Sequence, residues 1–122
     1  MKLHKKERRK YPRLDISGSV FALLKWNGSE LLGSITDISS GGFCLTHIDD
    51  NKELGGHSML RANLIHENKC YENFIARCIW SSTYIGDFVT ARVEMKRCGI
   101  QFEHLTDELQ GQLKEFIATL KN

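Results

Sequence analysis

The stretch ERRKYPR, residues 7–13, has the residue types and spacing to bind an anion, because it carries Arg8, Arg9 and Arg13 close together. A guanidinium group presents its N–H donors in a rigid planar fork. This fork fits phosphate oxygens, or a base edge with two adjacent acceptors, better than an ammonium group does. Taken alone, however, such a basic stretch is typical of solvated charge near a chain terminus.

A second group of residues lies about two dozen positions further on, in the stretch TDISSGG. It has the pattern Asp37-x-Ser39-x-x-Gly42. The carboxylate accepts hydrogen bonds, and a Ser-Gly-Gly turn exposes backbone N–H groups that attract an anion. Taken alone, the same string is explained by turn chemistry, with Asp and Ser bonding to the backbone and Gly supplying a positive φ.

Charge is distributed unevenly along the 122 residues. Residues 1–13 hold seven Lys or Arg against one Glu, a net charge of +6, and the other 109 residues carry a net charge of −4. The basic segment favours an anionic partner, and on charge alone nucleic acid, a nucleotide and a membrane surface all remain open. Because residues 1–13 are poor in apolar side chains, we expect a flexible arm, stiffened only near Pro12.

The elements that must position these residues are mostly strands. Apolar alternation and β-forming residues predict six of them, and Asn27-Gly28 and residues 67–69 are typical of hairpin turns. After residue 102 the apolar period becomes helical, and Thr106 is a plausible N-cap for a helix over 106–121. We therefore predict a mainly β domain over 14–122, a six-stranded antiparallel β-barrel with a C-terminal helix. The predicted strands are 14–26, 30–36, 43–47, 58–65, 71–82 and 89–102.

Together and in this order, the two motifs resemble those of the PilZ domain, the bacterial receptor module for cyclic di-GMP (c-di-GMP). Residues 8–13 match the family's RRxxxR arm, and residues 37–42 match its [D/N]xSxxG loop. The segments CIW (78–80) and GIQF (99–102) resemble the ends of the family's last two strands. One departure is the long stretch 84–97, which predicts an extended hairpin between those strands.

The resemblance implies a role for each motif residue. Arg9 and Arg13 would read guanine and phosphate, and Arg8 would accompany a stacked ligand dimer. Asp37 would accept hydrogen bonds from a guanine edge, because that edge presents N–H donors. Ser39 would bond to phosphate or base, and Gly42 would let the turn approach the ligand. Trp80 would offer a base an aromatic face, although a place in the core explains it equally well.

The expected function is that of a c-di-GMP receptor that is not an enzyme. On ligand binding the arm would fold over the barrel, and the domain would signal in trans to a downstream protein that the sequence does not identify. We expect the protein to be a monomer. One alternative is a PilZ-like protein-interaction module that binds no nucleotide. Another is a nucleic-acid-binding protein with a basic arm, although the net charge of −4 on the body argues against DNA binding.

The remaining chemistry-bearing residues point to no further site. The four cysteines contain no CxxC pair and the five histidines no HxxxH spacing, so we expect no metal and no cofactor. A Cys/His hydrolase stays open as a third alternative, without a supporting motif. No apolar run is long enough to span a membrane and no secretory signal is recognisable, which predicts a cytoplasmic protein without membrane insertion.

Overall fold

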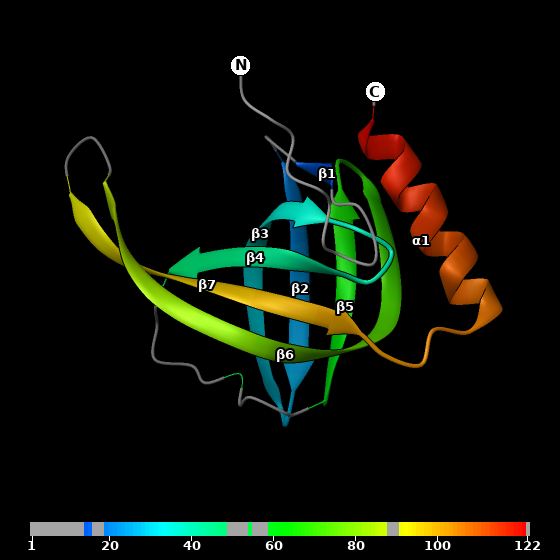
Figure 1. The fold of residues 1–122 in the computed structure, drawn as a ribbon, viewed down its shortest axis with the longest axis horizontal. Helices are drawn as coiled ribbons and strands as arrows, with labels where there is room; N and C mark the ends of the chain where they lie inside the picture. The colour runs from blue at the N-terminus through cyan, green and yellow to red at the C-terminus, as the bar shows by residue number, and fades with distance from the viewer. Residues whose placement is uncertain (1–13, 16–18, 49–53, 55–58, 88–90, 122) are drawn as a thin grey trace, which may run out of the picture.

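The computed structural model describes residues 14–15, 19–48, 54, 59–87 and 91–121, and they form one antiparallel sheet and one helix (Figure 1). The arm, residues 1–13, lies outside the described residues, as do Arg8, Arg9 and Arg13. The elements in chain order are β1 (Leu14–Asp15), β2 (Val20–Trp26), β3 (Ser29–Ile38), β4 (Gly42–Ile48), β5 (Met59–His66), β6 (Lys69–Asp87), β7 (Arg92–Phe102) and α1 (Asp107–Leu120).

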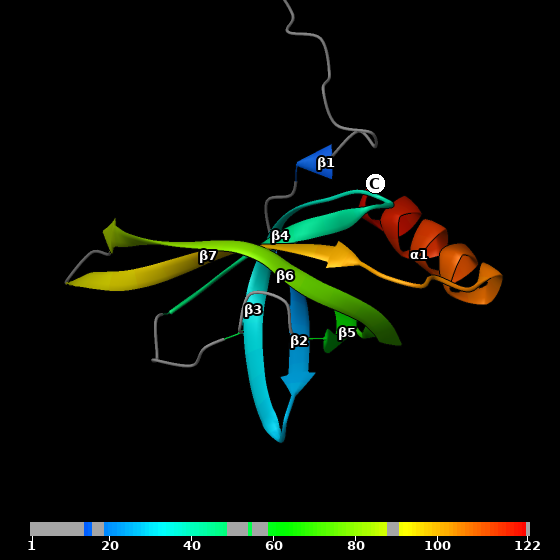
Figure 2. The ribbon, with the colours of Figure 1, turned by 60° about the horizontal axis from the view of Figure 1, so that its bottom comes forward.

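The sheet closes on itself. Its strand order is β1-β3-β2-β5-β6-β7-β4, and β4 pairs again with β3, so the six long strands form a ring. Figure 2 shows that β4, β6 and β7 cross over β2, β3 and β5 at a steep angle. The predicted mainly β fold with a closed antiparallel sheet and a C-terminal helix is confirmed.

Tight turns fix the register of the local hairpins. Asn27 and Gly28 join β2 to β3, with φ values of 48° and 79°. Two successive positive φ values are typical of the turn that matches the twist of paired strands, which explains the preference for Asn-Gly. Glu67, with a φ of 57°, begins the equally short turn between β5 and β6. Both predicted hairpins are therefore confirmed.

The first predicted strand is divided in the structure. Leu14 and Asp15 form the short strand β1, which pairs with Ile38 and Asp37 of β3, whereas β2 begins only at Val20. The prediction of a single strand over 14–26 was therefore wrong. Apolar alternation at the two ends of this stretch does not reveal that they pair with different parts of β3.

The hairpin of β6 and β7 is longer than the rest of the barrel. The two strands stay paired from Ala76 opposite Phe102 to Asp87 opposite Arg92. In Figure 1 this hairpin extends to the left beyond the other strands. The extended hairpin predicted over 84–97 is confirmed.

The core fills the ring and continues under α1. Phe102 contacts Phe43 and Phe74, with ring centroids 5.5 Å apart in both pairs. Helix α1 buries Leu113 and Phe116, and the Phe116 ring meets Tyr71 of β6 edge-on. The Thr106 side chain accepts a hydrogen bond from the N–H of Leu109, which confirms the predicted cap. The helix thus covers one side of the barrel (Figures 1 and 2).

Candidate ligand-binding site

A β-bulge turns Asp37 away from the core. Ile35 pairs with Leu45 and Asp37 pairs with Cys44, so Thr36 is the extra residue on β3. Side chains alternate between the faces of a regular strand, which would place Asp37 on the same face as the buried Ile35. The extra residue instead lets Ile35 and Ile38 both point inward, at 1% and 0% exposure, and leaves Asp37 half-buried on the outer face.

Ser39 folds the motif loop onto itself. Its backbone N–H donates to the Gly42 carbonyl at 2.8 Å, and its Oγ accepts a hydrogen bond from the Gly41 N–H at 3.1 Å. The side chain is buried at 5% exposure. Its hydroxyl therefore serves the turn in this structure, and its contact with a ligand stays a prediction.

Gly42 is required by space rather than by a positive φ. Gly28 is the only glycine with a positive φ among the described residues, so Gly42 does not supply the positive φ that the turn-chemistry explanation assigns to glycine. A Cβ at Gly42 would instead lie 2.1 Å from the Ile100 carbonyl oxygen on β7. The loop is also fastened to β7 by the Phe102 N–H, which donates to the Gly41 carbonyl at 3.0 Å. The motif loop is thus held firmly against the end of β7.

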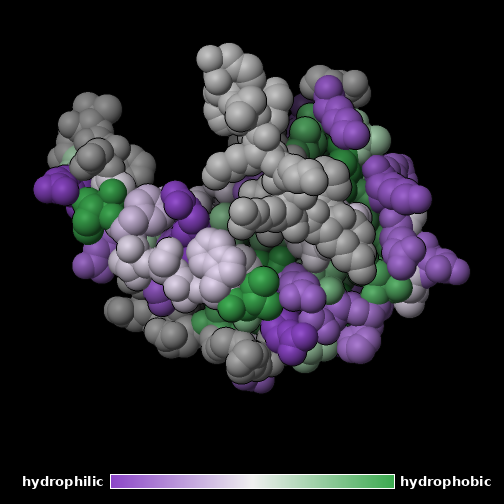
Figure 3. All heavy atoms as spheres, in the orientation of Figure 1, coloured by the Kyte–Doolittle hydropathy of each residue, from purple (hydrophilic) through white to green (hydrophobic). Residues whose placement is uncertain are grey.

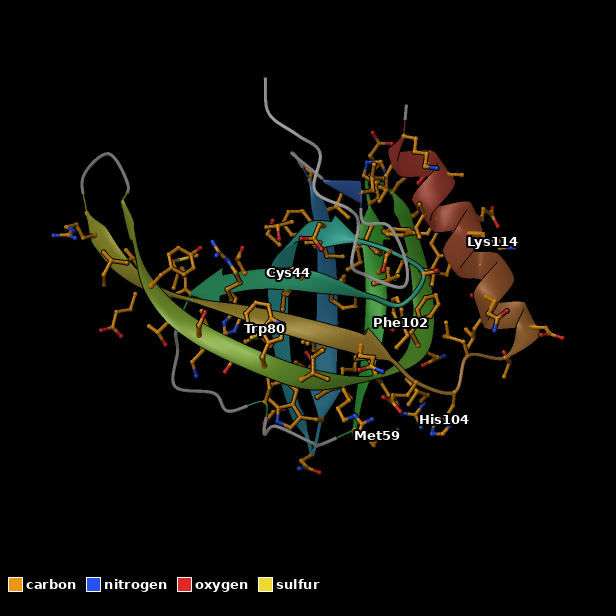
Figure 4. The ribbon with its side chains drawn as sticks, in the orientation of Figure 1. Cys44, Met59, Trp80, Phe102, His104 and Lys114 are labelled. Atoms are coloured by element: carbon orange, nitrogen blue, oxygen red, sulfur yellow. The ribbon has the colours of Figure 1, made fainter. Side chains whose placement is uncertain are left out.

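A second bulge places Trp80 on the same outer face as Asp37. Cys78 pairs with Ile100 and Trp80 pairs with Gly99, so Ile79 is the extra residue on β6. Cys78 belongs to the core, whereas Trp80 is 42% exposed. Its ring lies over Gly99, where a Cβ would be 2.1 Å from the indole Nε1 (Figure 4). The core interpretation of Trp80 is therefore wrong, since the side chain lies on the outer surface.

The two bulges bring the described site residues into one row across four strands. Asp37 of β3 is paired with Cys44 of β4, Cys44 with Gly99 of β7, and Gly99 with Trp80 of β6. Residues paired in this way project from the same face of a sheet. Three steps of about 4.8 Å place the Asp37 and Trp80 backbones at most about 14 Å apart. One acidic and one aromatic group therefore border the same surface, beside the motif loop.

A cavity of about 510 Å³ lies on the other side of the motif loop, between the loop and α1. It was not anticipated from the sequence. Ser40 and Gly41 form one wall, and Gln110 and Lys114, one helical turn apart, form another. The 3.6-residue period could have placed Gln110 and Lys114 on one helix face, but not which loop they meet. Lys114 adds a cation near the loop (Figure 4).

Cys78, Cys98 and His47 form a buried cluster on the inner side of the sheet. The Cys98 Sγ lies 3.8 Å from His47 Nε2, and the Cys98 thiol donates a hydrogen bond to Cys78, which lowers the pKa of Cys78 to about 7. Both cysteines and the histidine are at most 5% exposed, so this Cys/His pair is buried. Within the described residues, no group of three His, Cys, Asp or Glu side chains is arranged to hold a metal ion.

Comparison with known proteins assigns the family. The PilZ domain family model matches residues 7–119, nearly the whole chain. The match includes both sequence motifs as well as the barrel and helix described above. The chain therefore belongs to the PilZ domain family. A search of curated proteins found no significant match.

Solved structures share the fold at low sequence identity. The PilZ domain of YcgR from Escherichia coli, solved with c-di-GMP, superimposes with a TM-score of 0.79 at 20% identity, over 94% of this chain and 92% of that one. MrkH of K. pneumonia in its apo state gives a TM-score of 0.75 at 20% identity, over 97% of this chain. The Bacillus subtilis inhibitor of motility MotI gives 0.61 at 16% identity, over 90% of this chain.

The extent of these matches differs. The chain spans 53% of MrkH and 49% of MotI, about half the length of each. At these identities the likeness shows the fold. No helix among the described residues is both long and apolar enough to cross a membrane.

Proposed function

We propose that this protein is a receptor for c-di-GMP and not an enzyme. The observation that carries the proposal is the row from Asp37 to Trp80, which presents a carboxylate and an aromatic ring on one outer face beside the motif loop. Family membership supports it, as does the c-di-GMP bound to the PilZ domain of YcgR.

The chemistry of the ligand matches these groups. Each guanine presents N–H donors that a carboxylate such as Asp37 accepts, and a flat face that an indole such as Trp80 can stack against. Guanine also presents adjacent N7 and O6 acceptors, which suit the guanidinium groups of Arg9 and Arg13. The two phosphodiesters add the anionic charge that the basic segment 1–13 complements.

Binding is proposed to order the arginine-bearing arm over the barrel, with Arg8 favouring two stacked ligands per chain. Ordering six residues costs about 6–12 kcal/mol, whereas one bidentate guanine contact contributes roughly 1–3 kcal/mol. Micromolar affinity needs about −8 kcal/mol net. Several contacts must therefore form together, and each single loss should weaken binding steeply. The altered surface would then engage a downstream protein in trans.

Calorimetric titration with c-di-GMP, with GTP and cyclic di-AMP as controls, tests the proposal. We expect saturable binding of c-di-GMP alone, and at least about tenfold weaker binding for Arg9→Ala and Arg13→Ala. Lys2→Ala, which removes the same charge outside the motif, is the matched control. If Arg9→Ala bound c-di-GMP like the wild type, the proposed site would be wrong.

Two further measurements separate this function from its alternatives. Amide exchange of residues 4–13 should slow on saturation with c-di-GMP, and unchanged exchange would rule out arm ordering. Binding to duplex DNA that falls steeply with salt, in the absence of any response to c-di-GMP, would instead favour the nucleic-acid alternative. Absence of binding to both would favour a protein-interaction module.

A further inference from the structure

Strand β6 has a long edge without a neighbour in the described part of the chain. Its N-terminal half pairs with β5, and the last of these pairs joins Met59 to Arg77. Beyond that point, β6 pairs with β7 on one side alone, from Trp80 to Asp87. Backbone N–H and C=O groups of alternate residues point to the other side, where they can pair with a further strand. This edge borders the protruding hairpin in Figure 1.

The edge lacks charged residues and proline, two of the features that usually keep such a strand from pairing. Residues 79–85 contain no charged residue and no proline. Their composition, β-branched, aromatic and small hydroxyl side chains, is the one that strands favour. Ile79 and Ile85 are 47% and 46% exposed. Figure 3 shows weakly polar, pale side chains gathered over this part of β6, in contrast to the strongly hydrophilic outer face of α1. The edge is therefore suited to strand addition.

The order of side chains along the edge is symmetric about Ser82. On either side of Ser82 there follows a hydroxyl residue, then an aromatic residue, then an isoleucine. In full the segment reads Ile79, Trp80, Ser81, Ser82, Thr83, Tyr84, Ile85. An antiparallel strand pair between two identical chains places residue i opposite residue j and residue j opposite residue i. A segment with this symmetry therefore matches itself.

We propose that two copies of this protein pair through the β6 edge, with the twofold axis at Ser82. Trp80 then lies opposite Tyr84 of the second copy, and Ser82 opposite Ser82. Aromatic cross-strand pairs are among the favourable ones, and each would occur twice. The hydroxyls of Ser81 and Thr83 are matched on the other face.

A contact within one chain supports this arrangement. The Arg97 guanidinium lies over the Tyr84 ring, 4.8 Å from its centroid, and Arg97 is paired with Ser82 across β6 and β7. Trp80, Ser82 and Tyr84 alternate onto one face, because no register shift interrupts β6 after Trp80. Tyr84 is thus held in place on the face where Trp80 of the second copy would lie. The proposal replaces the monomer expected from the sequence.

The mass in solution tests the proposal. Sedimentation measures the apparent mass of the full chain without ligand. Over a series of increasing protein concentrations, this mass should rise from 14.0 kDa towards twice that value. Ser82→Lys and Ser82→Glu should each stay at the single-chain mass, because like charges would face each other across the axis. An equimolar mixture of the two variants should recover the doubled mass. Ser82→Thr, an uncharged control, should behave like the wild type.

Cross-linking locates the axis independently. With the exposed Cys70 replaced by serine, Ser82→Cys should form an intermolecular disulfide in air, with oxygen as the oxidant, and Thr83→Cys much less. A far-ultraviolet circular dichroism spectrum like that of the wild type and a cooperative thermal transition would show that each variant is folded. The proposal is overturned if the wild type keeps the single-chain mass into the millimolar range, if Ser82→Lys dimerises like the wild type, or if the mixture stays at the single-chain mass.

Discussion

The indole of Trp80 lies directly over Gly99, its partner on the neighbouring strand, so closely that a Cβ at position 99 would be 2.1 Å from the indole Nε1. Gly99 in turn pairs with Cys44, which pairs with Asp37. The absence of a side chain at Gly99 therefore lets an aromatic ring lie low on the surface, within the row of residues that contains the motif carboxylate.

Gly99→Ala should displace the Trp80 ring without unfolding the protein, because the obstructing atoms belong to a side chain that can rotate. In a Trp26→Phe background, Trp80 is the one remaining tryptophan. We expect its fluorescence to shift to longer wavelength in Gly99→Ala, and c-di-GMP to quench it less than in the Trp26→Phe parent. Identical spectra and quenching in the two proteins would contradict the described packing.

Asp37→Asn should weaken c-di-GMP binding by about 10–100-fold, since a hydrogen bond to a charged group contributes roughly 1.5–3 kcal/mol. The substitution keeps the shape of the side chain and removes its charge. Asp107→Asn, at the start of α1, is a matched control outside the row. Calorimetry measures both, and equal affinities for the two variants would remove Asp37 from the site.

Gly42→Ala and Gly111→Ala should change stability in opposite directions. A Cβ at Gly42 would meet the backbone oxygen of Ile100, whereas nothing lies within 4 Å of a Cβ at Gly111. We expect Gly42→Ala to lower the free energy of unfolding by about 1–3 kcal/mol, and Gly111→Ala to raise it by about 0.5–1 kcal/mol through helix propensity. Urea denaturation measures both values. A neutral Gly42→Ala would show that the loop does not lie as close to β7 as described.

The stability of the barrel should depend on the ionisation of Cys78. Its pKa is lowered to about 7, chiefly because the Cys98 thiol donates to it, so the folded state favours the thiolate. Stability should therefore rise with pH from about 7 towards the ordinary thiol value near 9, and this gain should disappear as the pH falls below 7. The same hydrogen bond, and to a lesser extent burial, raise the pKa of Cys98, which keeps Cys98 protonated throughout this window.

Cys98→Ala removes the donor and should flatten this pH dependence. Cys44→Ala, which also alters a buried cysteine, should leave it in place. Thermal unfolding at a series of pH values measures the effect. A slope that persists in Cys98→Ala would place its origin elsewhere.

Much of the fold could be predicted from local residue patterns. Asn27-Gly28 predicted one hairpin, and Thr106 predicted the start of the helix. Strand alternation on both sides of a long connecting stretch predicted the extended hairpin of β6 and β7. These features depend on neighbours in the chain, which a sequence displays directly.

The outer row could not be predicted in the same way. Asp37 and Trp80 reach it because Thr36 and Ile79 are extra residues in their strands. Strict alternation would place Asp37 with the buried Ile35 and Trp80 with the buried Cys78. The three-residue spacing of Ile35 and Ile38 hints at the first bulge, but only the partner strand shows which residue is extra. The family motif identified Asp37 without this knowledge.

The loop from Ser39 to Gly42 joins β3 to β4, the pair that closes the ring, and its bonds are made to itself and to β7. Natural selection would therefore retain its serine and glycine for the sake of folding, even in descendants that no longer respond to any nucleotide. Asp37 precedes this loop, and the role proposed for it is to bind the ligand. The aspartate and the arginines, rather than the serine and glycine, should thus distinguish working receptors from silent copies.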